Sequence, residues 1–136
     1  MIKGIAHVCF TASDLDASLA FYRDALGMDH AFDFVDERGR RTGVYLRAGG
    51  RTFIELFEGE VAAGAEGQPP QAYRHFCLEV DDIQAAVAAL RSRGVEVTEP
   101  KLGTDQSWQA WLADPDGNRI ELHQYTPDSR QTPWLG

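Results

Sequence analysis

Apolar and polar residues recur with two different periods along this chain, and the periods separate expected strands from expected helices. Residues 5–11 alternate as a short strand does, with successive side chains on opposite faces. A stripe at helical spacing follows, made of Leu15, Leu19, Tyr22 and Leu26. Ser13 and Asp14 offer oxygens that can cap this helix, and Gly27 offers a left-handed exit at its end. We therefore predict a strand and then a helix between residues 5 and 27.

Three further alternating stretches follow this helix, and the plan then recurs. The first three strands are expected at about 29–36, 42–48 and 51–57, joined by turns that contain glycine. In the second half, a strand at about 73–80 precedes a helix that Asp81 and Asp82 can cap and Gly94 can end. The apolar stripe of that helix is Ile83, Val87 and Leu90. The last three strands are expected at about 95–99, 107–113 and 118–125.

The second half of the chain repeats the first. The stretch IAHVCFTASDLDASLAFYRDALGM (5–28) aligns with YRHFCLEVDDIQAAVAALRSRGVEV (73–97), and TFIELFE (52–58) aligns with NRIELHQ (118–124). His75 follows His7 by 68 positions and Glu121 follows Glu55 by 66. Two separate matches at nearly one period indicate a duplicated βαβββ module.

We therefore predict an α+β fold, in which two tandem βαβββ modules form a cupped mixed sheet. One such module has a single helix for a four-stranded sheet and is too small to bury the sheet well, so the halves are expected to pair within a single domain of residues 1–136. Its expected parts are module one at about 1–58, a Gly-, Ala- and Pro-rich linker at about 59–71, module two at about 72–126 and a C-terminal tail at 127–136. The tail is expected to be frayed, or docked through Trp134 and Leu135.

Strand alternation divides the side chains between two faces. The helices are expected to cover Ile54, Leu56, Ile120 and Leu122. The opposite faces then carry Phe53, Glu55 and Phe57 in one module, and Arg119, Glu121 and His123 in the other. In the opening strands His7 shares a face with Cys9, and His75 shares one with Cys77. We expect both cysteines to be reduced and to serve packing.

Two histidines and two glutamates recur with the repeat. Glu55 follows His7 by 48 positions, and Glu121 follows His75 by 46. An approximate two-fold relation between the modules would bring these four side chains to one point. Imidazole and carboxylate together suit one divalent metal ion, and the set permits Ni, Co, Zn, Fe or Mn without choosing among them. His7, Glu55, His75 and Glu121 are therefore the predicted metal ligands.

Charge and hydropathy narrow the possible partners. The formal net charge of −8 argues against nucleic acid, which needs clustered lysine and arginine. No apolar run approaches the roughly 18 residues of a membrane span, and the N-terminus has no signal-peptide pattern. We expect a cytoplasmic protein with no membrane partner.

Several stretches resemble the vicinal oxygen chelate (VOC) superfamily, the glyoxalase/bleomycin resistance protein/dioxygenase family, and within it the glyoxalase I group. They are AHVCFTASDLDASLAFYRDALGM, FIELFE, YRHFCLEVDDIQAAV and LADPDGNRIELHQY, and together they span most of residues 5–125. The resemblance implies a metal site, a small-molecule substrate and a homodimer. In many relatives the site forms between chains.

The resemblance also implies an activity, that of a metal-dependent lyase or isomerase. The family's chemistry moves a proton next to a metal-bound carbonyl through an enediolate-like intermediate. The expected substrate is a small α-oxo or α-hydroxy carbonyl compound. Glu121 matches the glutamate that acts as base, and Glu55 is its counterpart. Candidate substrate contacts are Phe53, Phe57, Trp111, Arg119 and His123. Trp108 and Trp111 occupy opposite faces of one strand, and His123 reads equally as a second base or as a residue beyond the site.

The chain departs from the glutathione-dependent members of the group at two positions. Thr11 stands where they carry an arginine, and Gly59 or Glu58 stands where they carry an asparagine. The arginine and the asparagine, which this chain lacks, would bind the carboxylates of glutathione. Two alternatives therefore stay open beside the lyase. One is an epimerase acting on a thioester or a sugar-derived ketone. The other is a non-catalytic binding protein like the bleomycin-resistance proteins.

Overall fold

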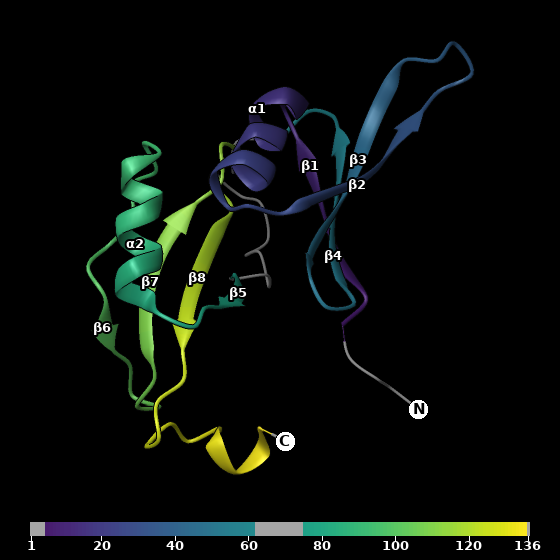
Figure 1. The fold of residues 1–136 in the computed structure, drawn as a ribbon. Coiled ribbons are helices and arrows are strands. Elements are labelled where there is room, and N and C mark those ends of the chain that lie inside the picture. Colours follow the sequence, from purple (N-terminus) through teal and green to yellow (C-terminus); the bar gives the residue numbers. More distant parts are fainter. Residues whose placement is uncertain (1–4, 62–74, 136) are drawn as a thin grey trace, which may run out of the picture. The chain divides into compact units, whose positions relative to one another are not determined.

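The computed structural model describes residues 5–61 and 75–135, which form two compact units (Figure 1). Most of the predicted linker at about 59–71 lies outside the described residues. Each unit has its own mixed four-stranded sheet. The predicted α+β class with two tandem modules is therefore confirmed.

Unit 1 follows the predicted βαβββ order. Its elements are β1 (His7–Ala12), α1 (Leu15–Leu19), the π-helical η1 (Ala20–Ala25), β2 (Asp29–Val35), β3 (Arg41–Gly49) and β4 (Thr52–Glu58). The strand order is β1-β4-β3-β2, with β1 parallel to β4 and the other pairs antiparallel. The β2–β3 hairpin projects well past the helix of its unit (Figure 1).

The helical segment of unit 1 begins and ends at the predicted residues. Asp14 is the N-cap, and its carboxylate accepts from the backbone N–H of Ala17 at 3.0 Å. The last turns widen into a π-helix, in which Leu26 N–H donates to the carbonyl of Phe21. Gly27 then takes a φ of 76°, which a residue with a Cβ resists.

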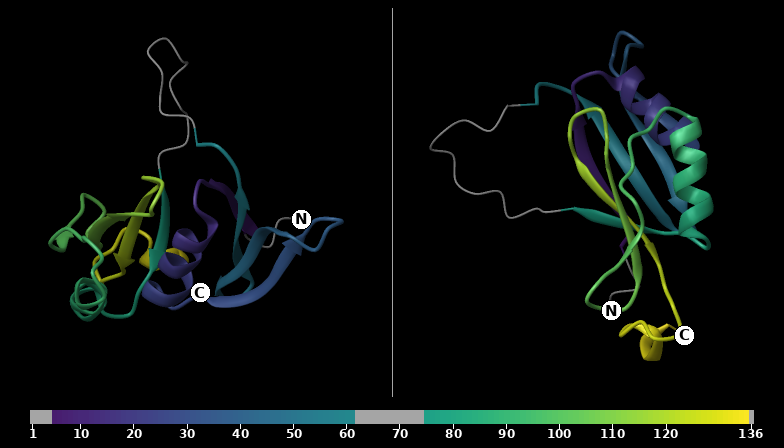
Figure 2. Two further views of the ribbon diagram at one scale, coloured as in Figure 1. Left: turned by 90° about the horizontal axis from the view of Figure 1, so that it is seen from above. Right: turned by 90° about the vertical axis from the view of Figure 1, so that its left-hand side faces the viewer.

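Unit 2 repeats the plan with shorter strands. Its elements are β5 (Phe76–Glu79), α2 (Ile83–Ser92), β6 (Lys101–Leu102), β7 (Trp108–Ala113), β8 (Arg119–Gln124) and the 3₁₀ turn η2 (Thr132–Trp134). The strand order is β5-β8-β7-β6, with β5 parallel to β8. Asp82 caps α2 through the backbone N–H of Ala85 at 3.0 Å. Figure 2 shows α2 lying along one face of β7 and β8.

The predicted strand at 95–99 is wrong. These residues form no regular strand, and the edge strand β6 begins only at Lys101. The segment does run beside β7, because Thr98 N–H donates to the carbonyl of Trp111 at 3.0 Å. The return bond from Trp111 N–H goes to the Thr98 hydroxyl and not to a backbone carbonyl. Pro100 has no N–H to offer, so a regular ladder cannot continue past it.

The helix-facing strand residues form the core of each unit, as alternation predicts. Ile54 and Leu56 are each 1% exposed, and Ile120 and Leu122 are as deeply buried. The helices bury most of their predicted stripes, with Tyr22 fully buried in unit 1 and Ile83 in unit 2, whereas Leu26 is only partly buried. Among residues 5–61 and 75–135, no helix of the same unit covers the opposite face of either sheet, and the functional candidates lie on that face.

The tail docks, although not through the predicted side chains. Trp134 is 86% exposed and Leu135 is 48% exposed. The anchors are polar instead, since the buried hydroxyls of Ser107 and Ser129 share a hydrogen bond of 2.8 Å. Asp105 also accepts from the Gln131 amide at 2.6 Å. Serine and glutamine leave no periodic signal in a sequence, which explains the error.

Across residues 5–61 and 75–135, no helix combines the length and the apolar character that crossing a membrane requires.

Candidate functional site

Glu121 lies between two imidazoles on the open face of unit 2. Its Oε2 lies 3.1 Å from Nε2 of His75, and its Oε1 lies 3.0 Å from Nδ1 of His123. The Glu121 side chain is only 12% exposed. The two carboxylate oxygens thus have different partners, which fixes the orientation of the side chain.

The β5–β8 pairing explains why these residues meet. In this parallel pair Cys77 stands opposite Glu121, and His75 directly precedes β5. On the other side of β8, Trp111 of β7 stands opposite Glu121. Side chains in directly opposed positions share a face. The period of two along β8 then places His123 on that face with Glu121.

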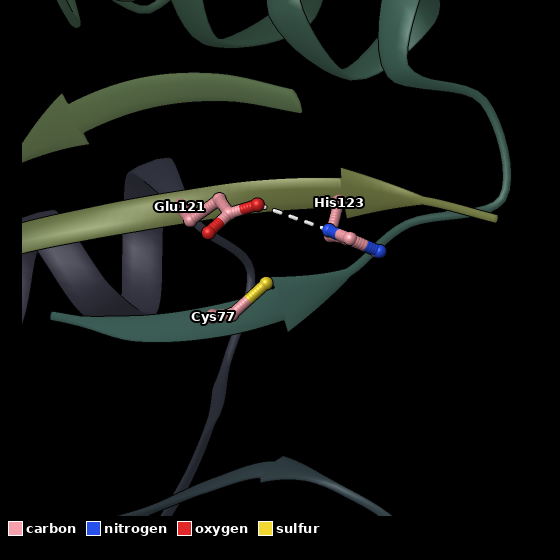
Figure 3. Close-up of side chains that lie close together, drawn as sticks. All are labelled: Cys77, Glu121 and His123. Carbon is pink, nitrogen blue, oxygen red and sulfur yellow. Dashed lines mark hydrogen bonds and ion pairs between the residues drawn. The ribbon is translucent and has the colours of Figure 1, made fainter. Parts of the chain in front are cut away.

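His123 is buried and bound to Glu121 (Figure 3). A carboxylate oxygen only accepts, so Nδ1 carries the hydrogen in this bond. Nε2 is buried and has no hydrogen-bond partner among the described residues, and the carboxylate of Asp105 lies 3.9 Å away. His123 therefore holds the Glu121 carboxylate in one orientation. Its predicted role as a substrate contact stays a prediction.

Cys77 completes a group of three possible ligand residues. Its sulfur, a Glu121 oxygen and a His123 nitrogen all lie within 4.8 Å of one another (Figure 3). Burial first, and then the carboxylate of Glu121, raise the pKa of the Cys77 thiol to about 12. The thiol is consequently protonated at neutral pH. A cation held by this group would bind Glu121 and an imidazole directly, and would bind Cys77 only after displacing the thiol proton.

Trp111 and Arg119 extend the same face. The Trp111 ring meets the His75 ring edge-on at 4.8 Å, and the Arg119 guanidinium lies 3.8 Å from the centre of the Trp111 ring. Trp108 stands instead opposite Gln124, whose amide oxygen accepts from the first residue of α2. Of the two tryptophans, Trp111 thus lies on the face of Glu121, and its contact with a substrate stays a prediction.

Unit 1 places Glu55 in the equivalent position. Cys9 stands opposite Glu55 in the parallel β1–β4 pair, as Cys77 stands opposite Glu121. Burial raises the pKa of Cys9, and a hydrogen bond to the Glu55 carboxylate raises it further. His7, two residues earlier on β1, is exposed on the same face. The duplication seen in the sequence therefore recurs in the strand register.

Aromatic rings lie beside Glu55 on the open face of unit 1. Of these rings, the sequence predicted only those of Phe53 and Phe57. Tyr45 stands directly opposite Glu55 on β3. Its ring stacks on Phe53 at 5.1 Å and on Phe32 at 4.8 Å, and meets His7 at 5.8 Å. Alternation along 42–48 already placed Tyr45 away from the helix, so this signal was available. Alternation could not predict the position of Phe32, because β2 contains register shifts.

The described residues suit a divalent ion. Ligand atoms about 2.1 Å from one ion and at right angles lie about 3 Å apart. The 3.1 Å between His75 Nε2 and Glu121 Oε2 agrees with this spacing. His123 donates to the other oxygen of Glu121, as partners of metal-binding carboxylates do. Unit 1 offers the same residue types, a histidine and a glutamate on one face.

Comparison with known proteins gives one consistent family. The family model described as Glyoxalase/Bleomycin resistance protein/Dioxygenase superfamily matches residues 4–122. The chain is 34% identical over 134 residues to the ethylmalonyl-CoA/methylmalonyl-CoA epimerase of Cereibacter sphaeroides, covering 91% of this chain and 99% of that protein. It is 32% identical over 130 residues to lactoylglutathione lyase of Haemophilus influenzae, covering 87% and 90%.

Solved structures agree with the family model. The antibiotic binding protein TnmS3 from Streptomyces sp. CB03234 matches with a TM-score of 0.71 and 31% identity, covering 92% of this chain and 98% of that one. These similar proteins carry three different descriptions, an epimerase, a lyase and a binding protein. What they have in common is the family. This chain belongs to the Glyoxalase/Bleomycin resistance protein/Dioxygenase superfamily.

Proposed function

We propose that the chain is a metal-dependent lyase or isomerase of glyoxalase I type. It moves a proton at the carbon next to the carbonyl of a small α-oxo or α-hydroxy carbonyl compound. The observation that carries this proposal is the setting of Glu121, a nearly buried carboxylate between His75 and His123. Each unit contributes one histidine and one glutamate to the ion, His7 with Glu55 and His75 with Glu121. The protein acts as a homodimer.

The ion supplies Lewis-acid polarisation of the substrate oxygens, which makes the neighbouring carbon-bound hydrogen more acidic. Glu121 accepts that proton. Its bond from His123 holds one oxygen in place, so the other oxygen, on the His75 side, is the one that would bind the ion and, once released from it, take up the proton. A base held in one orientation spends no rotamer freedom during the reaction. Glu55 is the second carboxylate, and in its protonated form it would deliver a proton to the neighbouring atom; Glu121 then loses its proton to solvent and Glu55 regains one from solvent.

The proposal does not extend to a glutathione adduct as the substrate. Thr11 and Gly59, the two departures from the glutathione-binding pattern, are neighbours in the structure. A Cβ built on Gly59 would lie 3.0 Å from Cγ2 of Thr11. An asparagine at position 59 would therefore have to displace Thr11. Neither residue offers a cation to a peptide carboxylate.

An epimerase is the second candidate. The strand register gives Glu55 and Glu121 equivalent places in the two units. An epimerase needs one carboxylate to remove a proton and another to return it on the opposite face of the same carbon. The epimerase relative from Cereibacter sphaeroides supports this candidate as well.

Metal content tests the ligand set. Purified protein is expected to hold about one divalent ion per His/Glu quartet, measured by atomic emission after dialysis. His75→Ala should lose most of that metal. His30→Ala is the matched control, because His30 belongs to β2 and pairs with Asp33 at 2.6 Å. Equal metal in the wild type and in His75→Ala would end the assignment.

Proton exchange tests the reaction. Metal-loaded protein is incubated in D2O with α-hydroxy ketones and α-oxo aldehydes, and NMR follows deuterium at carbon. Deuterium together with a rearranged product supports the lyase or isomerase. Deuterium with inversion and no new product supports the epimerase. Binding without any exchange across the series would overturn both.

A further inference from the structure

Aromatic rings from three neighbouring strands lie together on the open face of unit 1. The rings come from β2, β3 and β4 and belong to Phe32, Phe34, Tyr45, Phe53 and Phe57, which we call the aromatic face. Five of the fourteen Phe, Trp and Tyr residues of the chain lie in this one place. The helix of unit 1 covers the opposite side of the sheet, so packing against that helix does not explain them.

Contacts between the rings hold the aromatic face in a fixed arrangement. Tyr45 stacks on Phe32 with an interplanar angle of 18° and on Phe53 with one of 28°. Phe34 contacts Phe57 at 4.9 Å and Phe32 at 5.3 Å. Rings that already stack on one another lose little freedom when a further flat group is added.

The aromatic face stays open to a ligand. Phe32 is 49% exposed and Phe57 is 37% exposed. Gly43 makes room between Phe34 and Phe57, because a Cβ there would lie 2.7 Å from the Phe57 ring. Rings that are exposed, prearranged and uncovered within their own unit are typical of a binding surface.

The charges beside the aromatic face already have partners. Arg47, next to Phe53 across β3 and β4, is paired with Asp29. Arg41, at the other end of β3, is paired with Asp16. The aromatic face therefore offers flat apolar surface, and these two neighbouring cations are already neutralised. A neutral aromatic ring matches it in shape and in charge.

We propose that the aromatic face binds an aryl ring of the substrate, which is then an aryl-substituted α-oxo or α-hydroxy carbonyl compound. This inference rests on the proposed function, because it takes Glu55 as part of the reacting site. Tyr45 connects the two, since it stands opposite Glu55 and contacts the His7 ring. A ring stacked against Tyr45 and Phe53 would place the carbon chain of the substrate beside Glu55.

A matched pair of ligands tests the inference. 2-Hydroxyacetophenone and hydroxyacetone are both α-hydroxy ketones and differ in carrying a phenyl or a methyl group. Titration calorimetry on the metal-loaded protein should give a Kd at least about 10-fold lower for the phenyl compound. Exchange of the carbon-bound hydrogens in D2O is followed by NMR for the same two compounds.

Single substitutions decide whether the aromatic face causes the preference. Phe53→Leu and Tyr45→Leu should reduce the preference to about threefold or less. Phe32→Leu should reduce it too, and it is the variant least able to disturb folding because the ring is half exposed. Phe21→Leu is the control, since it also removes a ring, but from η1. It should keep the full preference.

The outcomes separate this inference from the proposed function. Phenyl preference with no proton exchange would sink the proposed function and leave the aromatic subsite standing. Proton exchange on both compounds with equal Kd values would overturn the aromatic subsite and leave the proposed function standing. An unchanged preference in all three face variants would overturn the aromatic subsite. So would a change in their sedimentation mass without a change in Kd, because the face would then be covered by a second copy.

Discussion

A carboxylate in water rotates freely and offers both oxygens to solvent. Glu121 does neither, because His75 and His123 each lie beside a different oxygen. The bond from His123 goes to Oε1 of this carboxylate. It fixes the direction from which Glu121 can meet an ion or a substrate.

Replacing His123 should weaken the site without removing a ligand. We predict that His123→Ala lowers metal affinity about 10- to 100-fold, as loss of such supporting partners does. His123→Gln keeps an N–H that can donate to Glu121 and should recover part of the loss. Competition with a chelating dye measures both affinities. Wild-type affinity in His123→Ala would show that Glu121 does not need this bond.

Gly43 tests the packing beneath the aromatic face. A Cβ at this position would lie 2.6 Å from the carbonyl oxygen of Leu56 and 2.7 Å from the Phe57 ring. The backbone oxygen cannot move easily, so Gly43→Ala should lower the free energy of unfolding by about 1–3 kcal/mol. Gly49→Ala in the same strand meets nothing within 4 Å and is the control. Urea unfolding measures both, and equal stability would contradict the packing argument.

For single residues, the sequence predicted the face of the strand on which a side chain lies better than it predicted which other side chains it contacts. The period of two along 118–125 placed Glu121 on the face away from the helix, and the structure agrees. It did not predict that His123 would bond to Glu121, because a side-chain rotamer has no periodic signal. Asp105 was missed for a related reason. It lies in an irregular turn, where neither helical nor strand spacing applies.

Helix caps are the features of elements that the sequence predicted most directly. Asp82 accepts from Ala85 N–H, whereas its neighbour Asp81 lies outside the first turn. Asp82→Ala should therefore lower the free energy of unfolding by about 1 kcal/mol. Asp81→Ala should leave it within about 0.5 kcal/mol of the wild type. Thermal and urea unfolding measure the free energy of unfolding of both variants. Equal losses would show that the cap is wrongly assigned to Asp82.

Elements that depend on backbone irregularity were not predictable. The π-helical turns of η1 carry the same apolar spacing that an α-helix would carry, so the stripe alone could not distinguish them. The segment 95–99 alternates as a strand does. Pro100 was the only sequence feature that argued against a regular hydrogen-bonded strand there. Composition and period determine where elements lie. Hydrogen bonds to side chains, such as the one from Trp111 to Thr98, determine how regular they are.

The docked tail gives a dependence on pH. The hydrogen bond from Gln131, and then those from Ser107, hold the pKa of Asp105 below its usual value. A carboxylate with a lowered pKa in the folded state stabilises that state above the unfolded pKa of about 3.9. The contribution is lost as the pH falls through the lower folded value. We therefore expect the tail to loosen below about pH 4.

NMR can follow this loosening at the Gln131 side-chain amide and at the backbone N–H of Arg130, which donates to the carbonyl of Asp105. Asp105→Asn removes the titrating carboxylate and should abolish the change in the Gln131 signals. A tail that loosens at the same pH in this variant would assign the effect to another group.

At the scale of the whole molecule, the duplication is the feature that organises the rest. The two units share strand order, capping aspartates and the Cys–Glu register. Their open faces have nevertheless diverged. Unit 1 carries the aromatic face, and unit 2 carries Trp111 with Arg119. The same strand plan thus carries equivalent Cys–Glu pairs and a different set of neighbouring side chains in each unit.

If both units contribute ligands, metal binding should stabilise the chain as a whole. A ligand at 100 times its Kd adds about 2.7 kcal/mol to the folded state. For a chain of 136 residues this corresponds to a rise in Tm of roughly 10 °C. Removing the metal with a chelator should lower the Tm of the wild type and of His30→Ala by this amount, and adding it back should restore the Tm. His75→Ala should show little response, and scanning calorimetry measures all three. An equal response in His75→Ala would place the stabilising ion elsewhere on the protein.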